Sequence, residues 1–333
     1  MSTLKDISKI ANVNVSTVSK ALRGSSDINQ QTILRIQKIA EQLNYKRTAY
    51  NTPVSGDTLP LIGIICPEVN SMYYADILNS LQLRLFEAGF QSIVMISNFD
   101  RTRETFCIDS LMRLRVNGIV FFTENDVDAD DLKNISYGNG MSFVVVSGGN
   151  NNDFCDNICI DELQSVSIAV THLINLKHTN IAYIGDSLSF KRRGYYIQTM
   201  ESYSIPINND YIIESDIRFE QCGYNGMIRL LQLKEPPTAI FAAYDNIAIG
   251  AMRAIYENGF SIPGDFSVIG IDNLRTSSFL NKALTSVTEP TADLGELTGE
   301  LIINRIRKNP AVQHIKLIPT LNTRETTAVL DIR

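Results

Sequence analysis

The chain has little that would serve disulfide or metal chemistry. Among 333 residues there are five cysteines and three histidines, and no C-x-x-C motif occurs. Cys155 and Cys159 are the only closely spaced cysteine pair. These spacings exclude a common zinc pattern and favour reduced thiols, with a redox or metal role as the alternative. We expect no metal and no cofactor.

Long apolar runs and signatures of catalysis are also missing. No stretch approaches the about 20 apolar residues of a transmembrane helix, and the N-terminus, MSTLKDISKI, lacks the basic and apolar regions of a signal peptide. We therefore expect a cytoplasmic protein. G-x-S-x-G, P-loop, G-x-G-x-x-G and H-E-x-x-H motifs do not occur, and the paired carboxylates Asp130 and Asp131 fall in an acidic loop. The sequence does not predict an enzyme.

The net charge of −6 hides an asymmetry. Residues 1–50 carry eight basic and three acidic side chains, a net charge of +5, whereas the rest carries 22 basic and 33 acidic side chains. A basic head on an acidic body suggests that the head alone meets a polyanion.

The head is predicted to form three short helices, because its apolar residues recur at helical spacing. Asn14 and Asn29 are placed to cap the second and third helices, and Gly24 to end the second. The three apolar stripes are Leu4, Ile7, Ile10 and Ala11; Val18, Ala21 and Leu22; and Ile33, Ile36, Ala40 and Leu43.

The outward face of the second helix carries short or flexible side chains. Val15, Ser16, Ser19 and Lys20 point away from its apolar stripe, so the helix could lie close against another surface. Together with the tight turn at residues 11–14, this predicts a helix-turn-helix whose second helix enters the DNA major groove. A three-helix bundle with a solvated basic face is the alternative.

After a linker around residues 46–60, which contains Pro53 and Gly56, the pattern changes. Buried strands alternate with amphipathic helices, which predicts an α/β fold with doubly wound parallel sheets. The number of strands favours two sheets, with a boundary near residues 158–161 and a ligand cleft at the strands' carboxyl ends. The strands are expected at residues 61–66, 93–96, 118–122, 143–146, 181–185, 239–243 and 268–271, and the helices at 74–88, 102–113, 163–176 and 247–258.

The residues resemble the LacI/GalR family of bacterial transcription regulators over nearly the whole chain. In the head the resemblance rests on residues 3–11, 13, 16–22 and 44–45. In the body it rests on residues 61–65, 116–119, 237–241, 245–251, 268–272 and 284–287. The motifs follow one another in the family's order.

The resemblance implies a homodimeric repressor that binds a palindromic operator on double-stranded DNA and a small effector, with no membrane contact. The implied domains are a helix-turn-helix headpiece at 1–46, a hinge at 47–59 and a type I periplasmic-binding-protein-like core at 60–333. The first lobe of the core would hold about residues 60–159 and 290–320, and the second about 160–289 and 321–333.

By this resemblance, three residues of the second helix choose bases. Lys20 could donate to guanine, Ser16 could serve either partner, and Val15 could pack on a thymine methyl group. The family more often has Arg at the Lys20 position, and Lys cannot form the bidentate fork. The remaining DNA-binding positions are Thr3, Thr17, Ser19, Arg23, Asn29, Thr32, Tyr45 and Thr48. For Thr17 and Ser19, bonding to their own backbone is the alternative.

The hinge segment differs from the family's sequence pattern more than any other part of the chain. Relatives have a short hinge helix whose Leu wedges into the minor groove, whereas here Val54 stands at that position, directly after Pro53. Because Pro disfavours a helical residue before it, we expect a distorted or absent hinge helix. A register slip that makes Tyr50 the apolar contact is the alternative.

Three residues resemble ligand contacts of the family's cleft. Tyr73 and Tyr74 could stack on a sugar or heterocycle, and Asp272 could accept from ligand hydroxyls or ring nitrogens. Core packing for the two tyrosines, and a turn role for Asp272, are the alternatives.

The family's cleft arginine is replaced by Lys191, so Arg192 or Arg193 could supply the guanidinium instead. The basic trio could favour a phosphorylated or carboxylated effector, or could simply be a solvated loop. Further expected effector contacts are Ser147, Ile217, Phe219 and Tyr244. The effector class, which could be a sugar, a sugar phosphate or a nucleobase-like compound, stays open.

Other functions compete with a ligand-controlled repressor. A binding protein of the periplasmic type would explain the body but not the head. Within transcription regulation, a phosphoprotein corepressor could dock on the core instead of a small molecule. The sign of the effector's action is also open, since an inducer and a corepressor differ only in which conformation they prefer.

Overall fold

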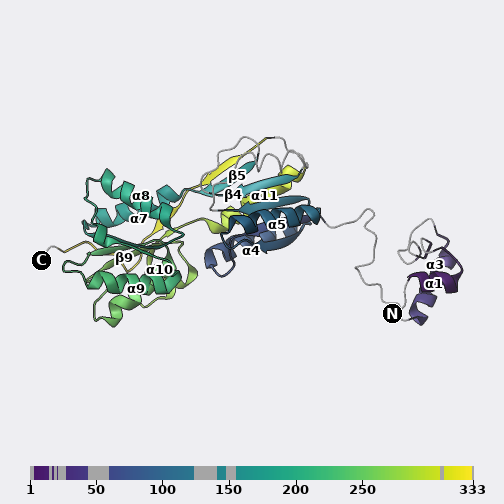
Figure 1. Ribbon diagram of the computed structural model, residues 1–333, viewed down its shortest axis with the longest axis horizontal. Coiled ribbons are helices and arrows are strands. Elements are labelled where there is room, and N and C mark those ends of the chain that lie inside the picture. Colours follow the sequence, from purple (N-terminus) through teal and green to yellow (C-terminus); the bar gives the residue numbers. More distant parts are fainter. Residues whose placement is uncertain are drawn as a thin grey trace. The chain divides into compact units, whose positions relative to one another are not determined.

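In the computed structural model of the protein (Figure 1), the described residues are 4–14, 17–18, 21, 28–43, 60–123, 141–147, 155–307 and 311–331. The chain divides into two compact units, Met1–Thr58 and Leu59–Arg333. Within the described residues, no helix is long and apolar enough to cross a membrane. All five cysteines lie within the described residues, and none of them, including Cys155 and Cys159, forms a disulfide.

The first unit contains helices α1 (Leu4–Ala11) and α3 (Gln30–Gln42), and residues 17–18 and 21 are also helical. Its small core is formed by Ile7, Ala11, Val18, Ala21, Ile36 and Ala40. The prediction that Ile10 belongs to the apolar stripe is wrong, because its side chain is 55% exposed. The inward face of α1 is the one that carries Ile7 and Ala11, four residues apart. Leu22 and Gly24 lie outside the described residues.

A tight turn follows α1. Asn12 adopts a left-handed conformation with a φ of 50°, which Asn tolerates better than most residues. Val18 N–H donates to the Asn14 carbonyl oxygen at 3.1 Å, so a second helical segment begins at Asn14. The Asn29 side chain accepts from Gln31 N–H at 2.9 Å, which makes Asn29 the cap of α3. These features form a helix-turn-helix.

The described part of the second unit contains two six-stranded sheets, as expected from the alternation of strands and helices. The first sheet has the order β11-β5-β4-β3-β1-β2, and all its neighbouring strands are parallel. Its strands are β1 (Leu61–Cys66), β2 (Gln91–Ile96), β3 (Gly118–Phe122), β4 (Ser142–Val146), β5 (Asp156–Ile160) and β11 (His314–Leu317).

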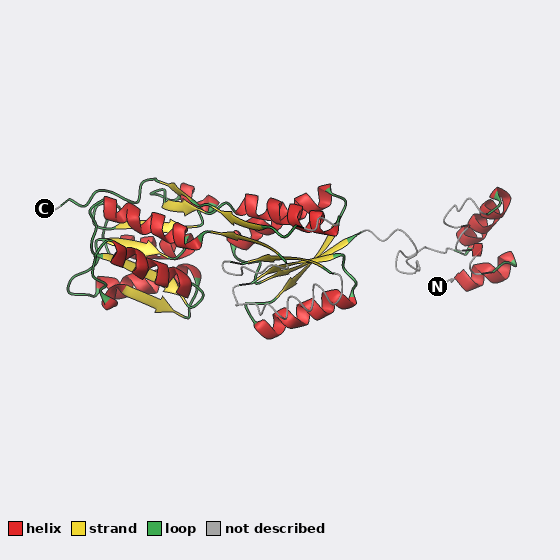
Figure 2. Ribbon diagram, turned by 90° about the horizontal axis from the view of Figure 1, so that it is seen from above, coloured by secondary structure: helices red, strands yellow, loops and turns green. Residues whose placement is uncertain are grey.

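Helices cover both faces of this sheet, as Figure 2 shows. Helices α4 (Met72–Glu87) and α11 (Thr291–Ile306) pack against each other and share a core with β1, β3 and β4. Helix α5 (Arg101–Arg113) packs on the opposite face. The continuous apolar sequence of β1 follows from this burial on both faces.

The second sheet has the order β12-β10-β9-β8-β6-β7. Its strands are β6 (Ile181–Asp186), β7 (Ile212–Ser215), β8 (Ala239–Ala242), β9 (Ser267–Ile271), β10 (Thr285–Thr288) and β12 (Thr320–Asn322). All pairs are parallel except the edge pair of β10 and β12. Figure 1 shows α7 (Glu162–Asn175) and α8 (Phe190–Ser202) on one side and α9 (Phe219–Leu231) and α10 (Asp245–Glu257) on the other.

The chain passes between the two lobes three times. Strand β5 ends the first sheet at Ile160, and Asp161 caps α7 in the second lobe by accepting from Gln164 N–H at 3.1 Å. The chain returns between β10 and α11, and crosses again between β11 and β12.

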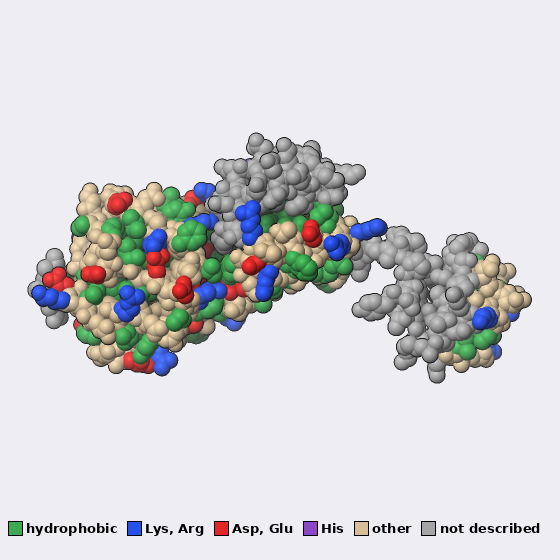
Figure 3. All heavy atoms as spheres, in the orientation of Figure 1, with side chains coloured by type: hydrophobic (Ala, Val, Ile, Leu, Met, Phe, Trp, Pro, Cys, Tyr) green, Lys and Arg blue, Asp and Glu red, His purple; other side chains and the backbone are tan. Residues whose placement is uncertain are grey.

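Basic, acidic and apolar side chains are interspersed over the face of the core seen in Figure 3. The visible, described surface of the core therefore shows no basic stripe of the kind that binds DNA.

Candidate functional site

The two lobes border a cavity at the carboxyl ends of their strands, with about 850 Å³ of space that is partly open to solvent. Ligand sites of α/β folds lie at these strand ends. From the first lobe the lining residues are Glu68, Ser71, Tyr73, Tyr74, Phe99 and Ile160. From the rest of the core they are Glu162, Asp186, Leu188, Ser189, Arg192, Arg218, Phe219, Tyr244, Asp272 and Glu289.

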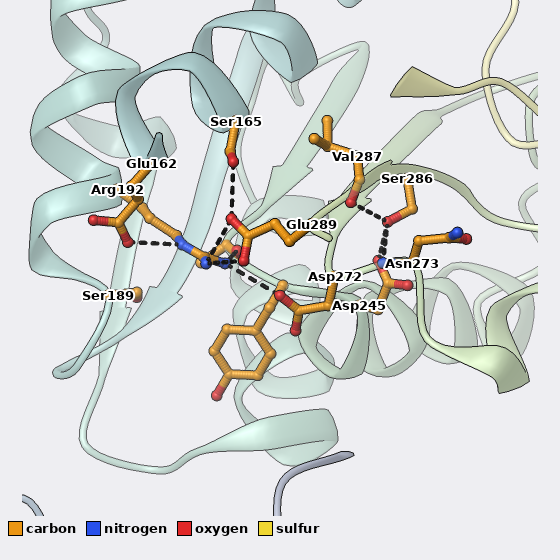
Figure 4. Close-up of polar contacts among 12 residues, drawn as sticks. Glu162, Ser165, Ser189, Arg192, Asp245, Asp272, Asn273, Ser286, Val287 and Glu289 are labelled. Carbon is orange, nitrogen blue, oxygen red and sulfur yellow. Dashed lines mark hydrogen bonds and ion pairs between the residues drawn. The ribbon is translucent and has the colours of Figure 1, made fainter. Parts of the chain in front are cut away.

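Arg192 of α8 lies among three carboxylates (Figure 4). Its Nε donates to Glu162 at 3.0 Å, and one terminal nitrogen donates to both oxygens of Glu289 at 3.3 Å. The other terminal nitrogen donates to the Ala243 carbonyl oxygen at 2.7 Å and lies 3.6 Å from Asp272. The guanidinium is therefore held on every side by α7, the end of β8 and the residues after β9 and β10.

The charges of this group shift one another. Burial lowers the pKa of Arg192, but Glu289, Asp272 and Glu162 outweigh it and raise this pKa well above its ordinary value. Burial raises the pKa of Asp272 well above its ordinary value, and Arg192 opposes the shift. The pKa of Glu289 is raised in the same way, although Ser165 donates a hydrogen bond to it at 2.8 Å. Arg192 therefore offsets only part of the cost of burying the charges of Asp272 and Glu289.

A second arginine connects the two lobes. Arg218, directly before α9, donates through both terminal nitrogens to the two oxygens of Glu68, at 2.8 and 3.0 Å. Its Nε donates to Asp186 at 3.3 Å. Glu68 follows β1 in the first lobe, so this forked ion pair spans the cleft. The guanidinium also lies 4.4 Å from the ring centroid of Phe219 and 5.4 Å from that of Phe99.

Tyr244 and Phe219 form a fixed wall of the cavity. The Tyr244 hydroxyl donates to Asp186 in a short hydrogen bond and accepts from Phe219 N–H at 3.2 Å. Phe219 has a φ of 60°, a conformation that costs a bulky residue of order 1–3 kcal/mol and persists only where the surroundings impose it. The two rings meet edge to face, with centroids 6.0 Å apart.

Tyr73 and Tyr74 begin α4 on the opposite side. Their rings meet edge to face at 5.1 Å, and Tyr74 also packs on Phe99 and Phe122 at 6.2 and 6.5 Å. Tyr74 is only 8% exposed. Tyr74 is therefore part of the first-lobe core and also lines the cavity. Its contact with an effector stays a prediction.

The loop that carries Asp272 is held in place by the buried carboxylate of Asp245. Asp272 and Asn273 have φ values of 101° and 51°. Asp245, at the start of α10, accepts from Leu274 N–H at 2.9 Å, from Ser277 Oγ at 2.5 Å and from Ser286 Oγ at 2.6 Å. Burial raises the pKa of Asp245 to about 6, although these hydrogen bonds act in the opposite direction and lower it. Asp245 thus positions the loop without lining the cavity.

Six of the nine predicted effector contacts line this cavity: Tyr73, Tyr74, Arg192, Phe219, Tyr244 and Asp272. Ser147 instead lines a smaller hollow that Tyr73 and Tyr74 also border. Ile217 is 49% exposed and is not among the cavity's lining residues. Lys191 is not among them either, and its ammonium lies 6.0 Å from the ring of Phe190.

Sequence reasoning missed most of the acidic residues of the cavity and one of its arginines. Glu68, Glu162, Asp186, Glu289 and Arg218 were not predicted as contacts, although each lies near the end of a strand or the start of a helix. Acidic residues directly after buried strands are the signal that could have found Asp186 and Glu289.

Few of the predicted DNA contacts can be placed. Thr17 and Thr32 are half-buried and Asn29 is exposed, with Asn29 and Thr32 at the N-terminus of α3. Backbone N–H groups at such an end favour phosphate. Thr3, Val15, Ser16, Ser19, Lys20, Arg23, Tyr45, Thr48, Tyr50 and Val54 lie outside the described residues.

Comparisons with known proteins agree with this architecture. One family model, described as bacterial regulatory proteins of the lacI family, matches residues 3–48, and a periplasmic binding protein-like domain matches residues 170–327. The chain is 29% identical over 312 residues to the HTH-type transcriptional repressor PurR of Actinobacillus pleuropneumoniae serotype 3, covering 92% of both chains. It is 26% identical over 325 residues to catabolite control protein A of Priestia megaterium, covering 95% of this chain and 96% of that one.

Two solved structures show the same fold. The lac repressor dimer bound to operator and the anti-inducer ONPF has a TM-score of 0.77 at 22% identity, covering 98% of this chain and 99% of that one. A LacI family regulator from Enterococcus faecium with bound ribose has a TM-score of 0.70 at 24% identity, covering 81% of this chain and 100% of that one.

A helix-turn-helix unit joined to a two-lobed core with a polar cleft defines a ligand-responsive DNA-binding regulator. The two family models together match more than half of the chain, and the relatives match it almost end to end. The chain belongs to the LacI family of bacterial transcriptional regulators.

Proposed function

We propose that the protein is a homodimeric repressor whose affinity for a palindromic operator is changed by a small polar effector bound between the core lobes. Residues 1–46 bind DNA, residues 47–59 connect, and residues 60–333 bind the effector and dimerise. The lobes divide at about residues 60–159 with 290–320, and 160–289 with 321–333. The operator-bound lac repressor dimer and the ribose-bound regulator, both similar in fold, support the two halves of this proposal.

The observation that carries the proposal is a cavity with walls from both lobes. Tyr73 stands on the first lobe, and Arg192 and Asp272 stand on the second. A ligand that contacts both walls must bind the closed arrangement of the lobes better than the open one. By linkage, it then changes any other equilibrium, such as operator binding, that depends on the same arrangement.

In the headpiece, Val15, Ser16 and Lys20 are proposed to contact bases, and Thr3, Thr17, Ser19, Arg23, Asn29, Thr32, Tyr45 and Thr48 to contact the DNA backbone. The geometry that supports this is the turn at Asn12 between helical segments and the exposed start of α3. Tyr50 or Val54 remains the proposed hinge contact.

In the core, the proposed effector contacts are Tyr73, Tyr74, Arg192, Phe219, Tyr244 and Asp272, which line one cavity. Ser147 would join them if the effector extends into the adjoining hollow. Ile217 and Lys191 stay sequence-based proposals for the cavity's surroundings.

A binding experiment with the full-length protein tests both halves. A preferred sequence is first selected from random double-stranded DNA, and its affinity is then measured with and without small polar compounds. We expect a palindromic site, and a compound that changes its affinity about 5- to 150-fold, since allosteric couplings are typically 1–3 kcal/mol. Weakened binding would define an inducer and tightened binding a corepressor. A protein that selects no sequence, or whose operator affinity responds to no compound, would contradict the corresponding half.

A further inference from the structure

The three passages of the chain between the lobes are short, and we call them the first, second and third crossovers. They lie at residues 160–162 between β5 and α7, at 288–291 between β10 and α11, and at 317–320 between β11 and β12. Because a packed sheet lies on either side, a rotation of one lobe against the other must be taken up by the backbone of these few residues.

One residue in each of the first two crossovers adopts a turn conformation. Asp161 has φ −74° and ψ 87°, and Pro290 has φ −77° and ψ 66°. Both lie between the helical and extended regions. At Pro290 this is an inverse γ-turn, in which Thr291 N–H donates to the Glu289 carbonyl oxygen at 2.8 Å. The direction in which each crossover leaves its lobe is therefore set at a single residue.

Arg192 joins the side chains next to these two turn residues. Glu162 directly follows Asp161, and Glu289 directly precedes Pro290. Arg192 Nε donates to Glu162 at 3.0 Å, and one terminal nitrogen donates to both oxygens of Glu289 at 3.3 Å. Figure 4 shows the guanidinium between the two carboxylates. A change of direction at either turn would move one carboxylate away from the other and stretch these bonds.

The third crossover is attached to the first. Asp161 N–H donates to the Leu317 carbonyl oxygen at 2.9 Å, and the Lys316 ammonium lies 3.3 Å from the Asp161 carboxylate. Ser165 adds a further connection, because its hydroxyl donates to Glu289 at 2.8 Å and lies 3.3 Å from the Asp161 carbonyl oxygen. The three crossovers thus form one connected group, with Arg192 bonded to two of them.

The donors of Arg192 are largely occupied by the protein itself. Besides the bonds to Glu162 and Glu289, its other terminal nitrogen donates to the Ala243 carbonyl oxygen at 2.7 Å and lies 3.6 Å from Asp272. Its side chain is only 13% exposed. A guanidinium has five N–H groups, so this one has little capacity left for a ligand. Its effect on ligand binding must therefore go mainly through the arrangement of the lobes.

Building on the proposed function, we infer that Arg192, Glu162 and Glu289 form an interlobe clamp that stabilises the lobe arrangement in which Arg218 meets Glu68. Arg192 is then a positioning residue beyond its place in the cavity wall. The clamp sets the fraction of the protein that is ready to bind an effector, and apparent affinity scales with that fraction. A residue that only contacts an effector would leave the effector-free lobes unchanged.

Arg192→Lys tests the clamp in the full-length protein. Lysine keeps the positive charge beside the buried carboxylates, but its single nitrogen cannot reproduce the fork that spans Glu162 and Glu289. Small-angle scattering without effector should show a larger radius of gyration. For the compound that changes operator affinity in the screen above, we expect about ten- to a hundredfold weaker apparent binding. A native scattering curve would overturn the inference, even where effector binding is weaker.

Arg305→Lys is the matched control. Arg305 of α11 forms a similar fork with the buried Asp156 of β5, at 2.9 and 2.6 Å, within the first lobe. This variant should lower the urea midpoint without changing the radius of gyration. An equal increase in both variants would mean general loosening and would overturn the clamp.

A double variant shows whether Arg192 acts through Glu162. Glu162→Gln breaks the same bridge from its other side, so adding it to Arg192→Lys should open the lobes no further than the larger single effect. Additive opening would overturn the assigned partnership. If the protein selects no operator or responds to no compound, the proposed function fails, whereas the effector-free scattering still decides the role of Arg192.

Discussion

Arg218 and Glu68, 150 residues apart in the chain, form a two-pronged ion pair between the lobes, with donor–acceptor distances of 2.8 and 3.0 Å. Forked guanidinium–carboxylate pairs are among the stronger polar contacts in proteins because charge and geometry act together. Glu68 is 7% exposed, so water screens this pair little. The pair is thus placed to favour the closed arrangement of the lobes.

Glu68→Gln should therefore open the cleft. Glutamine has one acceptor oxygen and no charge, so one of the two hydrogen bonds and the ionic attraction are lost. A hydrogen bond to a charged group contributes about 1.5–3 kcal/mol, so the closed form should lose at least about tenfold in population. Small-angle scattering of the full chain should show a larger radius of gyration. Glu214→Gln, which breaks an arginine pair within one lobe, is the control. Identical curves for Glu68→Gln and the native protein would contradict the assigned role.

Asp272→Asn should weaken the effector response strongly and leave operator binding intact. The amide loses the negative acceptor that faces the cavity and presents donors to Arg192, 3.6 Å away. We expect effector affinity to fall about ten- to a hundredfold. Fluorescence anisotropy on labelled operator DNA, with and without effector, measures both properties. Asp216→Asn is the control, because Asp216 is exposed and does not line the cavity. A normal response in Asp272→Asn would contradict the site.

Most apolar strands could be predicted because strands buried on both faces are continuous apolar runs in the sequence, and most helices because they are amphipathic. Strand β1 was predicted at the residues where it lies. Strands β5, β7, β10, β11 and β12 were missed, because each is short and carries polar residues. In β10 the polar groups are satisfied by distant partners: Ser286 donates to Asp245, and Thr285 N–H donates to Thr326. No local pattern reveals such tertiary hydrogen bonds.

The sequence likewise could not predict which individual side chains line the cavity. In a helix, neighbouring residues point about 100° apart, so a shift of one position separates Arg192, inside the cavity, from Lys191, outside it. Motif spacing left that choice open. The Arg218–Glu68 pair depends on how two lobes meet, which no motif within either lobe encodes.

Helices α9 and α10 cross so closely that neither Gly223 of α9 nor Gly250 of α10 should tolerate a side chain. A Cβ on Gly250 would lie 1.8 Å from the Glu220 carbonyl oxygen, and one on Gly223 would lie 1.8 Å from that of Ile247. Gly250→Ala should therefore destabilise the core by about 1–3 kcal/mol or more, because backbone must move. Gly194→Ala in α8 is the control: nothing lies within 4 Å of the added methyl group, and stability should rise by about 0.5–1 kcal/mol. Equal denaturation midpoints for the two variants would contradict this packing.

Acid should weaken the anchorage of the C-terminal segment. The ring of His178 is 3% exposed and lies 2.9 Å from Thr238, 3.0 Å from Ser267 and 3.1 Å from the Ala328 carbonyl oxygen. Burial lowers its pKa and that of His172. Because the folded state prefers neutral imidazole, this contribution to stability is complete above about pH 6.5, the unfolded value, and is lost as pH falls towards the lower folded pKa.

His178→Gln should cost about 1–3 kcal/mol at pH 7.5, since buried partners lose their hydrogen bonds. The same variant should lose less further stability than the native protein between pH 7.5 and 5.5. Urea denaturation at the two pH values measures the difference. His314→Gln, at an exposed position of β11, should behave as the native protein does. A native-like loss of stability with acid in His178→Gln would exclude His178 as the cause.

Lys20→Ala should reduce discrimination between operator and random DNA about 5- to 150-fold. The resemblance places Lys20 among the residues that read bases, where one good contact contributes about 1–3 kcal/mol. Lys38→Ala, on the exposed surface of α3, removes the same charge from the same unit and should leave discrimination intact. Each variant can lower the salt dependence of binding by at most about one counterion, because only one charge is lost. The measurement is the ratio of specific to non-specific affinity at fixed salt. If both variants change that ratio equally, the effect of Lys20 is general electrostatics and the base-reading assignment is wrong.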